Sequence, residues 1–230
     1  MKKFGAFLLA GVLAIGTLTG CVNGILVTKL KLQPFIATLG TMEIFRGIAY
    51  VVTNGVPVVG VPDSYRVIFN TKLFSGIYVY VYVFLVAAIV FGIVLAKTRL
   101  GNYLYAVGGN EEAARLSGVN IDWVKIRAYM ICAFCAALAG CISLSNLGSG
   151  NPTAGEGYEL EAIAACTIGG VSANGGVGSV GGILVGVLVF EILKICLQFL
   201  GVDPAYTYIA QGLVIIIAVA LDLRKYLAKK

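Results

Sequence analysis

The sequence has 230 residues, of which 59% are hydrophobic and only 12% are charged, and its formal net charge is +6. A soluble domain carries about a quarter charged residues, so this composition excludes an ordinary soluble protein. Several apolar runs approach the ~20 residues with which a helix crosses a bilayer, whereas the alternation typical of spanning β-strands is absent. We therefore predict an all-α fold, a polytopic membrane helical bundle.

Seven apolar segments are predicted as helices of a single transmembrane domain over residues 1–230. Six approach the length of a membrane span, and the segment near 159–169 is too short to span alone. In chain order the segments are about 4–27, 33–53, 77–96, 128–146, 159–169, 181–200 and 205–221.

The first segment has two competing interpretations. Basic residues at the start, an apolar stretch and Leu18-Thr19-Gly20-Cys21 are typical of a bacterial lipoprotein signal. The apolar character nevertheless continues through residues 22–27, and no polar mature segment follows. We therefore favour a transmembrane helix.

Two pairs of opposite charge lie three residues apart inside predicted helices, Glu43 with Arg46 and Glu191 with Lys194. Residues at this spacing meet on one helix face. Charges at membrane depth are costly unless they are paired, so we interpret both sets as pairs that satisfy each other.

Aromatic and sulfur-containing side chains have simple structural interpretations. Tyr78, Tyr80 and Tyr82 open the third span as interface anchors, and at alternate helical positions they are not expected to share a face. Cys132 and Cys135 form a Cys-x-x-Cys pair inside an apolar helix, in a chain without histidine. We expect small buried thiols there, with neither a metal site nor a catalytic residue.

The longest strongly polar interval is residues 97–127, between the third and fourth spans. Asn110 can cap a short helix, Glu111 and Glu112 suit its first turn, and Gly118 can end it. A compact capped helix between two spans predicts a surface to which another protein docks, although an ordinary solvated loop is the alternative.

A glycine-rich segment follows the short apolar helix, Gly169-Gly170-Val-Ser-Ala-Asn-Gly175-Gly176-Val-Gly178. Irregular backbone at membrane depth requires protein or a water-filled cavity around it. We predict a broken or re-entrant helix near 159–178 beside a pathway, or close helix packing through small residues.

Placing the central polar interval and the basic tail at 222–230 on the cytoplasmic side gives a consistent topology from residue 29 onward. Lys29 and Lys31 are then cytoplasmic, and the acidic segment 147–161 is outside. Lys2 and Lys3 fall on the wrong side. This mismatch favours further spans upstream or a misassigned start.

Three segments resemble the permease subunits of bacterial ABC sugar importers, of the ribose and galactose/methyl-galactoside types. They are residues 34–42 (PFIATLGTM) with Arg46-Gly47, residues 106–120 (AVGGNEEAARLSGVN), and residues 158–165 (YELEAIAA) with the following Gly-Gly. The likeness runs from about Gly20 to the C-terminus. Chains of that family are longer at the N-terminus, which agrees with the topological mismatch.

The resemblance implies that the chain is not an enzyme but a multi-pass inner-membrane permease with no cofactor of its own. A cytoplasmic ABC ATPase would bind and hydrolyse ATP. A periplasmic or lipid-anchored sugar-binding protein would deliver the sugar, and a second copy of the permease chain would complete the path as a homodimer. The resemblance also implies a coupling helix that contacts the ATPase, formed by Gly108, Gly109, Asn110, Glu111, Glu112, Ala113, Ala114, Arg115, Ser117 and Gly118.

Neutral sugars need hydrogen-bonding partners along a translocation path. The candidate residues are Asn146, Glu159, Glu161, Ser172 and Asn174. Two other functions remain open. An ion-coupled secondary transporter would use intramembrane acids such as Glu43 or Glu191, and a lipid-anchored membrane scaffold would carry a lipid on Cys21.

Overall fold

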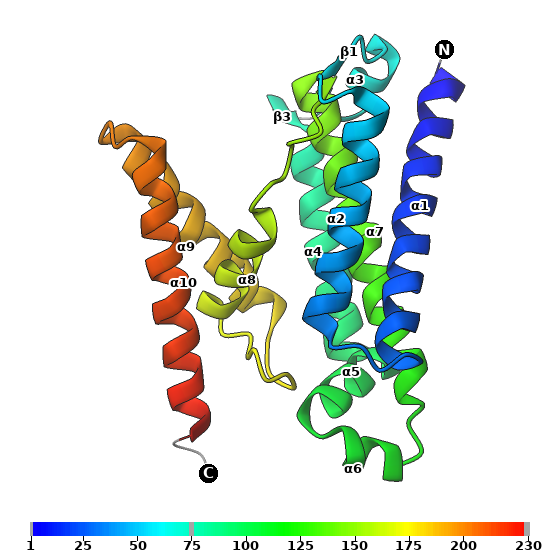
Figure 1. Cartoon of the computed structure of the whole chain (residues 1–230), viewed down its shortest axis with the longest axis vertical. Coiled ribbons are helices and arrows are strands. Elements are labelled where there is room, and N and C mark those ends of the chain that lie inside the picture. The colour runs from blue at the N-terminus through cyan, green and yellow to red at the C-terminus, as the bar shows by residue number, and fades with distance from the viewer. Residues whose placement is uncertain (1, 74–75, 228–230) are drawn as a thin grey trace. The chain divides into compact units, whose positions relative to one another are not determined.

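A computed structural model of the chain describes residues 2–73 and 76–227 (Figure 1). Its helices are α1 (Lys2–Thr28), α2 (Pro34–Thr53), α3 (Asp63–Asn70), α4 (Val79–Lys97), α5 (Arg99–Gly109), α6 (Glu111–Leu116), α7 (Ile121–Leu147), α8 (Tyr158–Ile168), α9 (Val180–Phe199) and α10 (Pro204–Leu227). Its two-residue strands are β1 (Val58–Val59), β2 (Lys72–Leu73), β3 (Ile77–Tyr78) and β4 (Ser149–Gly150).

The predicted all-α polytopic fold is confirmed. Within the described residues, α2, α4, α7, α9 and the Ala6–Thr28 part of α1 are long and apolar enough to cross a bilayer. A shorter apolar stretch, Tyr208–Ala220, lies in α10. The side chains of Lys2, Lys3 and the basic tail 222–230 lie outside the described part, so their predicted side of the membrane stays a prediction.

The chain divides into two compact units. Unit 1 comprises Met1–Ala87 and Asn120–Ala154, and unit 2 comprises Ala88–Val119 and Gly155–Lys230. The single domain predicted from the sequence stays a prediction.

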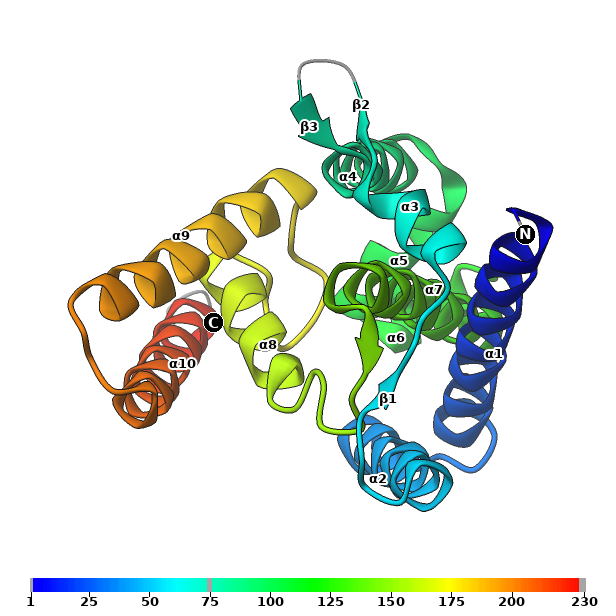
Figure 2. The same ribbon diagram turned by 90° about the horizontal axis from the view of Figure 1, so that it is seen from above.

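Helices α1 and α7 form the main seam of unit 1 and run side by side (Figures 1 and 2). Gly16, Gly20 and Gly24 repeat every four residues along α1 and face α7. A Cβ on Gly16 would lie 2.5 Å from the Ala137 Cβ, and a Cβ on Gly24 would lie 2.7 Å from the Ile126 Cα. Small residues at this spacing let helix backbones approach closely in a membrane. The α1 helix is continuous through Cys21, as the transmembrane interpretation requires.

The short helix α3 closes one end of unit 1 by hydrogen bonding to α7. The Tyr65 hydroxyl donates to the Cys141 carbonyl oxygen at 3.1 Å, and Asn70 Nδ2 donates to the Ser145 carbonyl oxygen at 2.8 Å. The Ser145 hydroxyl donates in return to the carbonyl oxygen of Arg66 at 2.9 Å. Burial raises the pKa of Tyr65, and Cys141 raises it further, so the hydroxyl stays protonated as a donor.

Unit 2 contains a packed group of three helices, in which α8 contacts both α9 and α10. Its core contains Ala164 and Ala165 from α8 and Phe190 from α9, which is only 2% exposed. The close α8–α9 approach depends on small residues, since a Cβ on Gly169 would lie 2.5 Å from the Gly182 carbonyl oxygen. After α8 the chain turns irregularly before α9 begins at Val180, as predicted for a broken helix.

The structure corrects two expectations about side chains. Tyr78 and Tyr80 stack on each other with ring centroids 5.4 Å apart, because Tyr78 belongs to the extended strand β3 and not to the helix. Of the two Cys-x-x-Cys thiols, neither is buried: Cys132 is exposed and Cys135 is half-buried. They lie on the apolar surface of α7, so lipid or another chain would surround Cys132.

Candidate functional site

The polar interval between α4 and α7 folds into the two short helices α5 and α6. Asn110 ends α5 and caps α6, since its Oδ1 accepts a hydrogen bond from the Ala113 N–H at 3.0 Å. Glu111 and Glu112 occupy the first turn, where the helix dipole favours acids. Gly118 follows the helix with φ +79°, a left-handed conformation suited to glycine. The capped helix predicted from the sequence is therefore present.

Gly108 and Gly109, which were included in the expected coupling helix, are the last two residues of the preceding helix α5. Glycine is a poor helix former, so residues 99–109 carried only a weak helical signal. The start of α5 is nevertheless capped, since Thr98 Oγ1 accepts from the Gly101 N–H at 3.3 Å.

Sequence reasoning also missed Leu116, the last residue of α6. Leu116 is 89% exposed, whereas Ala114 two residues earlier is buried. Glu112 and Arg115 are also exposed. The available signal was a single large apolar residue within the otherwise polar or small segment EEAARL. The result is an apolar tip with charged neighbours, a common composition for a contact surface.

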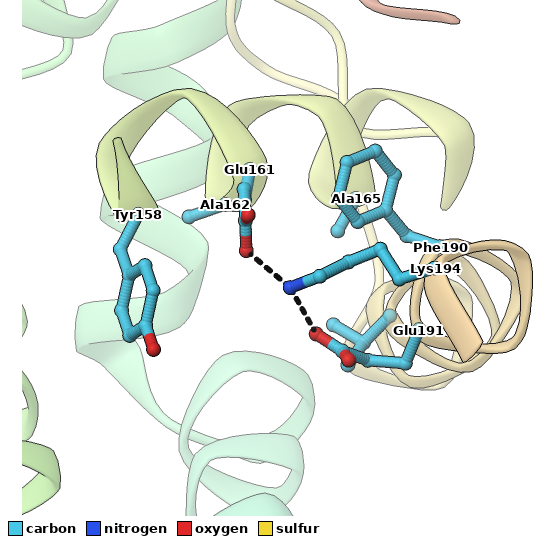
Figure 3. Close-up of a pocket in the computed structure, with 8 residues that line it drawn as sticks. Tyr158, Glu161, Ala162, Ala165, Phe190, Glu191 and Lys194 are labelled. Carbon is cyan, nitrogen blue, oxygen red and sulfur yellow. Dashed lines mark hydrogen bonds and ion pairs between the residues drawn. The ribbon is translucent and has the colours of Figure 1, made fainter. Parts of the chain in front are cut away.

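A second polar feature is a pocket of about 310 Å³ between α8 and α9 (Figure 3). Its polar lining comes from Tyr158 and Glu161 on α8 and from Glu191 and Lys194 on α9. Phe190 forms part of the apolar lining. Lys194 extends across the pocket toward both carboxylates, as Figure 3 shows.

Lys194 is the centre of a charge network that joins α8, α9 and α10. Its Nζ donates to Glu161 Oε2 at 2.9 Å and, less closely, to Glu191 Oε1 at 3.5 Å. The Nε2 of Gln211 on α10 donates to the other Glu161 oxygen at 3.2 Å. Glu191 and Lys194 were expected to satisfy each other alone. Lys194 instead lies closer to Glu161 than to Glu191, and the Glu191 contact is one part of a larger network. In contrast, Glu43 and Arg46 pair as predicted, at 3.4 Å.

Four of the candidate path residues lie on α8 or on the turn that follows it in unit 2, and Asn146 belongs to unit 1. Glu161 lines the pocket, whereas Glu159 in the first turn of α8 is not among its lining residues. Ser172 and Asn174 belong to the turn after α8, where the Asn174 N–H donates to the Ser172 hydroxyl oxygen at 3.3 Å. Asn146 is an exposed residue near the end of α7 in unit 1.

These helices and their polar segments are those of a multi-pass membrane permease. The family model described as "Branched-chain amino acid transport system / permease component" matches residues 2–219, and the chain belongs to that family. The predicted resemblance to permeases of sugar importers and the predicted inner-membrane location are confirmed by this match and by the relatives described next.

The curated relatives include ribose and galactose permeases. The chain is 45% identical to the ribose import permease protein RbsC of Bacillus subtilis, over 88% of this chain and 63% of that protein. It is 40% identical to the galactose/methyl galactoside import permease protein MglC of Haemophilus influenzae, over 95% of this chain and 67% of that protein. It is 42% identical to RbsC of Escherichia coli K12, over 94% of this chain and 68% of that protein.

The chain therefore spans about two thirds of the length of these relatives. No solved structure matches the chain.

Proposed function

We propose that this chain is the transmembrane permease subunit of an ATP-binding-cassette importer that moves a monosaccharide of the ribose/galactose class. The observation that carries the proposal is the capped helix α6, displayed between two apolar helices, in a chain whose relatives are named as ribose and galactose import permeases. ATP is bound and hydrolysed by a separate subunit, and this chain supplies the path and the docking surface.

Two contacts within unit 1 support the proposed membrane topology independently of the charge distribution. Strand β1 pairs with β4, so the segments after α2 and after α7 lie at one end of unit 1. Lys29 Nζ lies 3.0 Å from Asp122 Oδ2, so the α1–α2 turn and the start of α7 also lie at one end. Because α2 and α7 each separate two of these segments, the two pairs lie at opposite ends of unit 1. The basic residues of the interval 97–127 then assign the second pair to the cytoplasm and the first pair to the outside.

The proposed partners follow from this assignment. The cytoplasmic ATPase contacts α6 through its charged sides and the exposed Leu116. A sugar-binding protein contacts the outer segments, where α3 presents Asp63, Arg66 and Asn70 around a second polar pocket of about 310 Å³. A second permease chain flanks the path.

We propose that the pocket between α8 and α9 contributes to the sugar path. Its carboxylates accept hydrogen bonds and its ammonium group donates them, which suits the hydroxyl groups of a neutral sugar. The exposed ring of Tyr158 offers an aromatic surface for the apolar face of a sugar ring. Ligand sites commonly combine such apolar walls with a few placed polar groups.

Uptake measurements test the proposed function against the two alternatives. Uptake of radiolabelled D-ribose or D-galactose into cells that express the importer should stop on ATP depletion and continue when the ion gradient is collapsed. The opposite result would indicate an ion-coupled secondary transporter. Incorporation of a radiolabelled fatty acid at Cys21, without uptake, would indicate the lipid-anchored scaffold.

The Leu116→Asp variant should weaken binding of the ATPase, because a carboxylate replaces the apolar tip of α6. We expect a loss of affinity of about tenfold, as typical for an interface anchor. Co-purification of the ATPase with the permease, quantified against membrane expression, measures the effect. Leu73→Asp is the matched control, since Leu73 is also exposed but lies in the proposed outer segment. Equal ATPase recovery from both variants would contradict docking through α6.

The Tyr158→Ala variant should raise the KM of sugar uptake, because the ring that lines the pocket is removed. A change of about 10-fold corresponds to the loss of one good aromatic contact. Tyr206→Ala serves as control, because Tyr206 on α10 is 63% exposed, close to the 65% of Tyr158, and is not among the pocket-lining residues. An unchanged KM in the Tyr158 variant would remove this pocket from the sugar path.

A further inference from the structure

The end of α5 meets the turn between α8 and α9 backbone to backbone. This turn, residues 169–179, is called the glycine turn below. A Cβ placed on Gly108 would lie 2.5 Å from the Gly176 nitrogen, and a Cβ on Gly176 would lie 2.7 Å from the Gly109 Cα. No side chain separates the two segments, so neither can shift toward the other.

A hydrogen bond holds the same two segments together. The Tyr105 hydroxyl, one turn before Gly108 on α5, donates to the carbonyl oxygen of Gly178 at 2.8 Å. The contact thus resists separation as well as approach. All of these residues belong to unit 2.

The glycine turn is internally braced and continues directly into the α8–α9 seam. The Ser172 N–H donates to the Val177 carbonyl oxygen at 3.0 Å, and the Gly175 N–H donates to the Ser172 carbonyl oxygen at 3.1 Å. At its start, Gly169 packs against the backbone of Gly182 in α9. A displacement of the turn therefore has to move α8 against α9, because close-packed backbones do not absorb it.

We propose that Tyr105, Gly108 and Gly176 form a clasp that transmits movement of α6 to the α8–α9 pair and to the pocket that holds Glu161 and Lys194. The inference rests on the proposed function, in which an ATPase displaces α6. These are positioning residues: they contact neither ATP nor sugar. The proposal is argued from a continuous, close-packed connection that runs from α6 through α5 and the glycine turn to α8 and α9.

The Gly108→Ala variant tests the clasp in the complete importer complex. The added methyl group forces the glycine turn away from α5, so the ATPase should still bind and hydrolyse ATP while sugar uptake falls. We expect the ATP hydrolysed per molecule of D-ribose or D-galactose taken up to rise by about tenfold. A purely structural defect would lower both rates together with the amount of complex.

Gly181→Ala is the matched control, because it is also a helical glycine in unit 2 and its added Cβ meets nothing within 4 Å. It should keep the wild-type ratio of hydrolysis to uptake. Tyr105→Phe removes only the hydrogen bond to Gly178 and should raise the ratio by a smaller factor. If Gly108→Ala does not assemble, the ratio of hydrolysis to uptake in Tyr105→Phe tests the clasp.

The clasp is overturned if the assembled Gly108→Ala complex hydrolyses as much ATP per sugar molecule as the wild type. If Gly108→Ala does not assemble, the clasp is overturned by a wild-type ratio of hydrolysis to uptake in Tyr105→Phe. Both results leave the proposed function intact. Failure of the proposed function looks different, because the wild-type complex itself would then show no ATP-dependent uptake.

Discussion

Replacing Lys194 with Met should destabilise the chain by on the order of 3 kcal/mol, because it leaves a largely buried carboxylate without its cation. Lys194 and Glu161 are each 21% exposed, and the Lys194 Nζ is the closest donor to Glu161 at 2.9 Å. In the variant, Glu161 keeps the Gln211 amide of α10 as a hydrogen-bond donor at 3.2 Å but loses its cation. Unfolding by SDS in detergent, followed by circular dichroism, measures the loss.

Two further variants separate the charge effect from simple loss of the Lys194 side chain. Adding Glu161→Gln to Lys194→Met restores the original net charge of the network and should recover much of the stability. Lys29→Met also removes a lysine that forms an ion pair at 3.0 Å, but Lys29 and Asp122 are 65% and 42% exposed. Such a surface pair contributes about 0–1 kcal/mol, so this control should change little. Equal losses in the two lysine variants would show that the network is not significantly desolvated.

A Gly20→Leu substitution should separate α1 from α7 and destabilise unit 1 by about 3 kcal/mol or more, as expected when a packed seam has no room for added atoms. Even a single Cβ on Gly20 would lie 2.8 Å from the Met130 Cα, on the backbone of α7. The same SDS titration, supported by protease sensitivity of the α1–α2 turn, measures the effect.

Gly11→Leu is the control for this seam, since Gly11 lies in the same helix and an added Cβ there meets nothing within 4 Å. The leucine is apolar and a better helix former than glycine, so we expect no loss of stability. If Gly20→Leu were as stable as Gly11→Leu, close packing on α7 would not be what holds α1 in place.

Local signals in the sequence predicted the elements that depend on neighbouring residues. The cap on α6 needs only Asn110 and the backbone three residues later, and the Glu43–Arg46 pair needs only helical spacing. Helix α5 was missed because its glycines weaken the helical signal, and Tyr78 was assigned to a helix because strand β3 is only two residues long.

Contacts between distant residues were beyond local reasoning. Glu161 and Lys194 are separated by 33 positions in the sequence and come together only because α8 packs on α9. The meeting of Gly108 with Gly176 has the same origin, since a glycine shows that close approach is allowed but not which segment approaches.

Composition and hydropathy alone determined that the chain is a helical membrane protein with one prominent polar interval. Unpaired backbone groups and charges are costly in lipid, so few structures other than helices can cross the bilayer. Only the tertiary structure decided which partner satisfies each charge and which backbone each glycine contacts. The physical reason is that helix propensity and capping act over a few residues, whereas helix packing depends on the shape of two surfaces brought together by the whole fold.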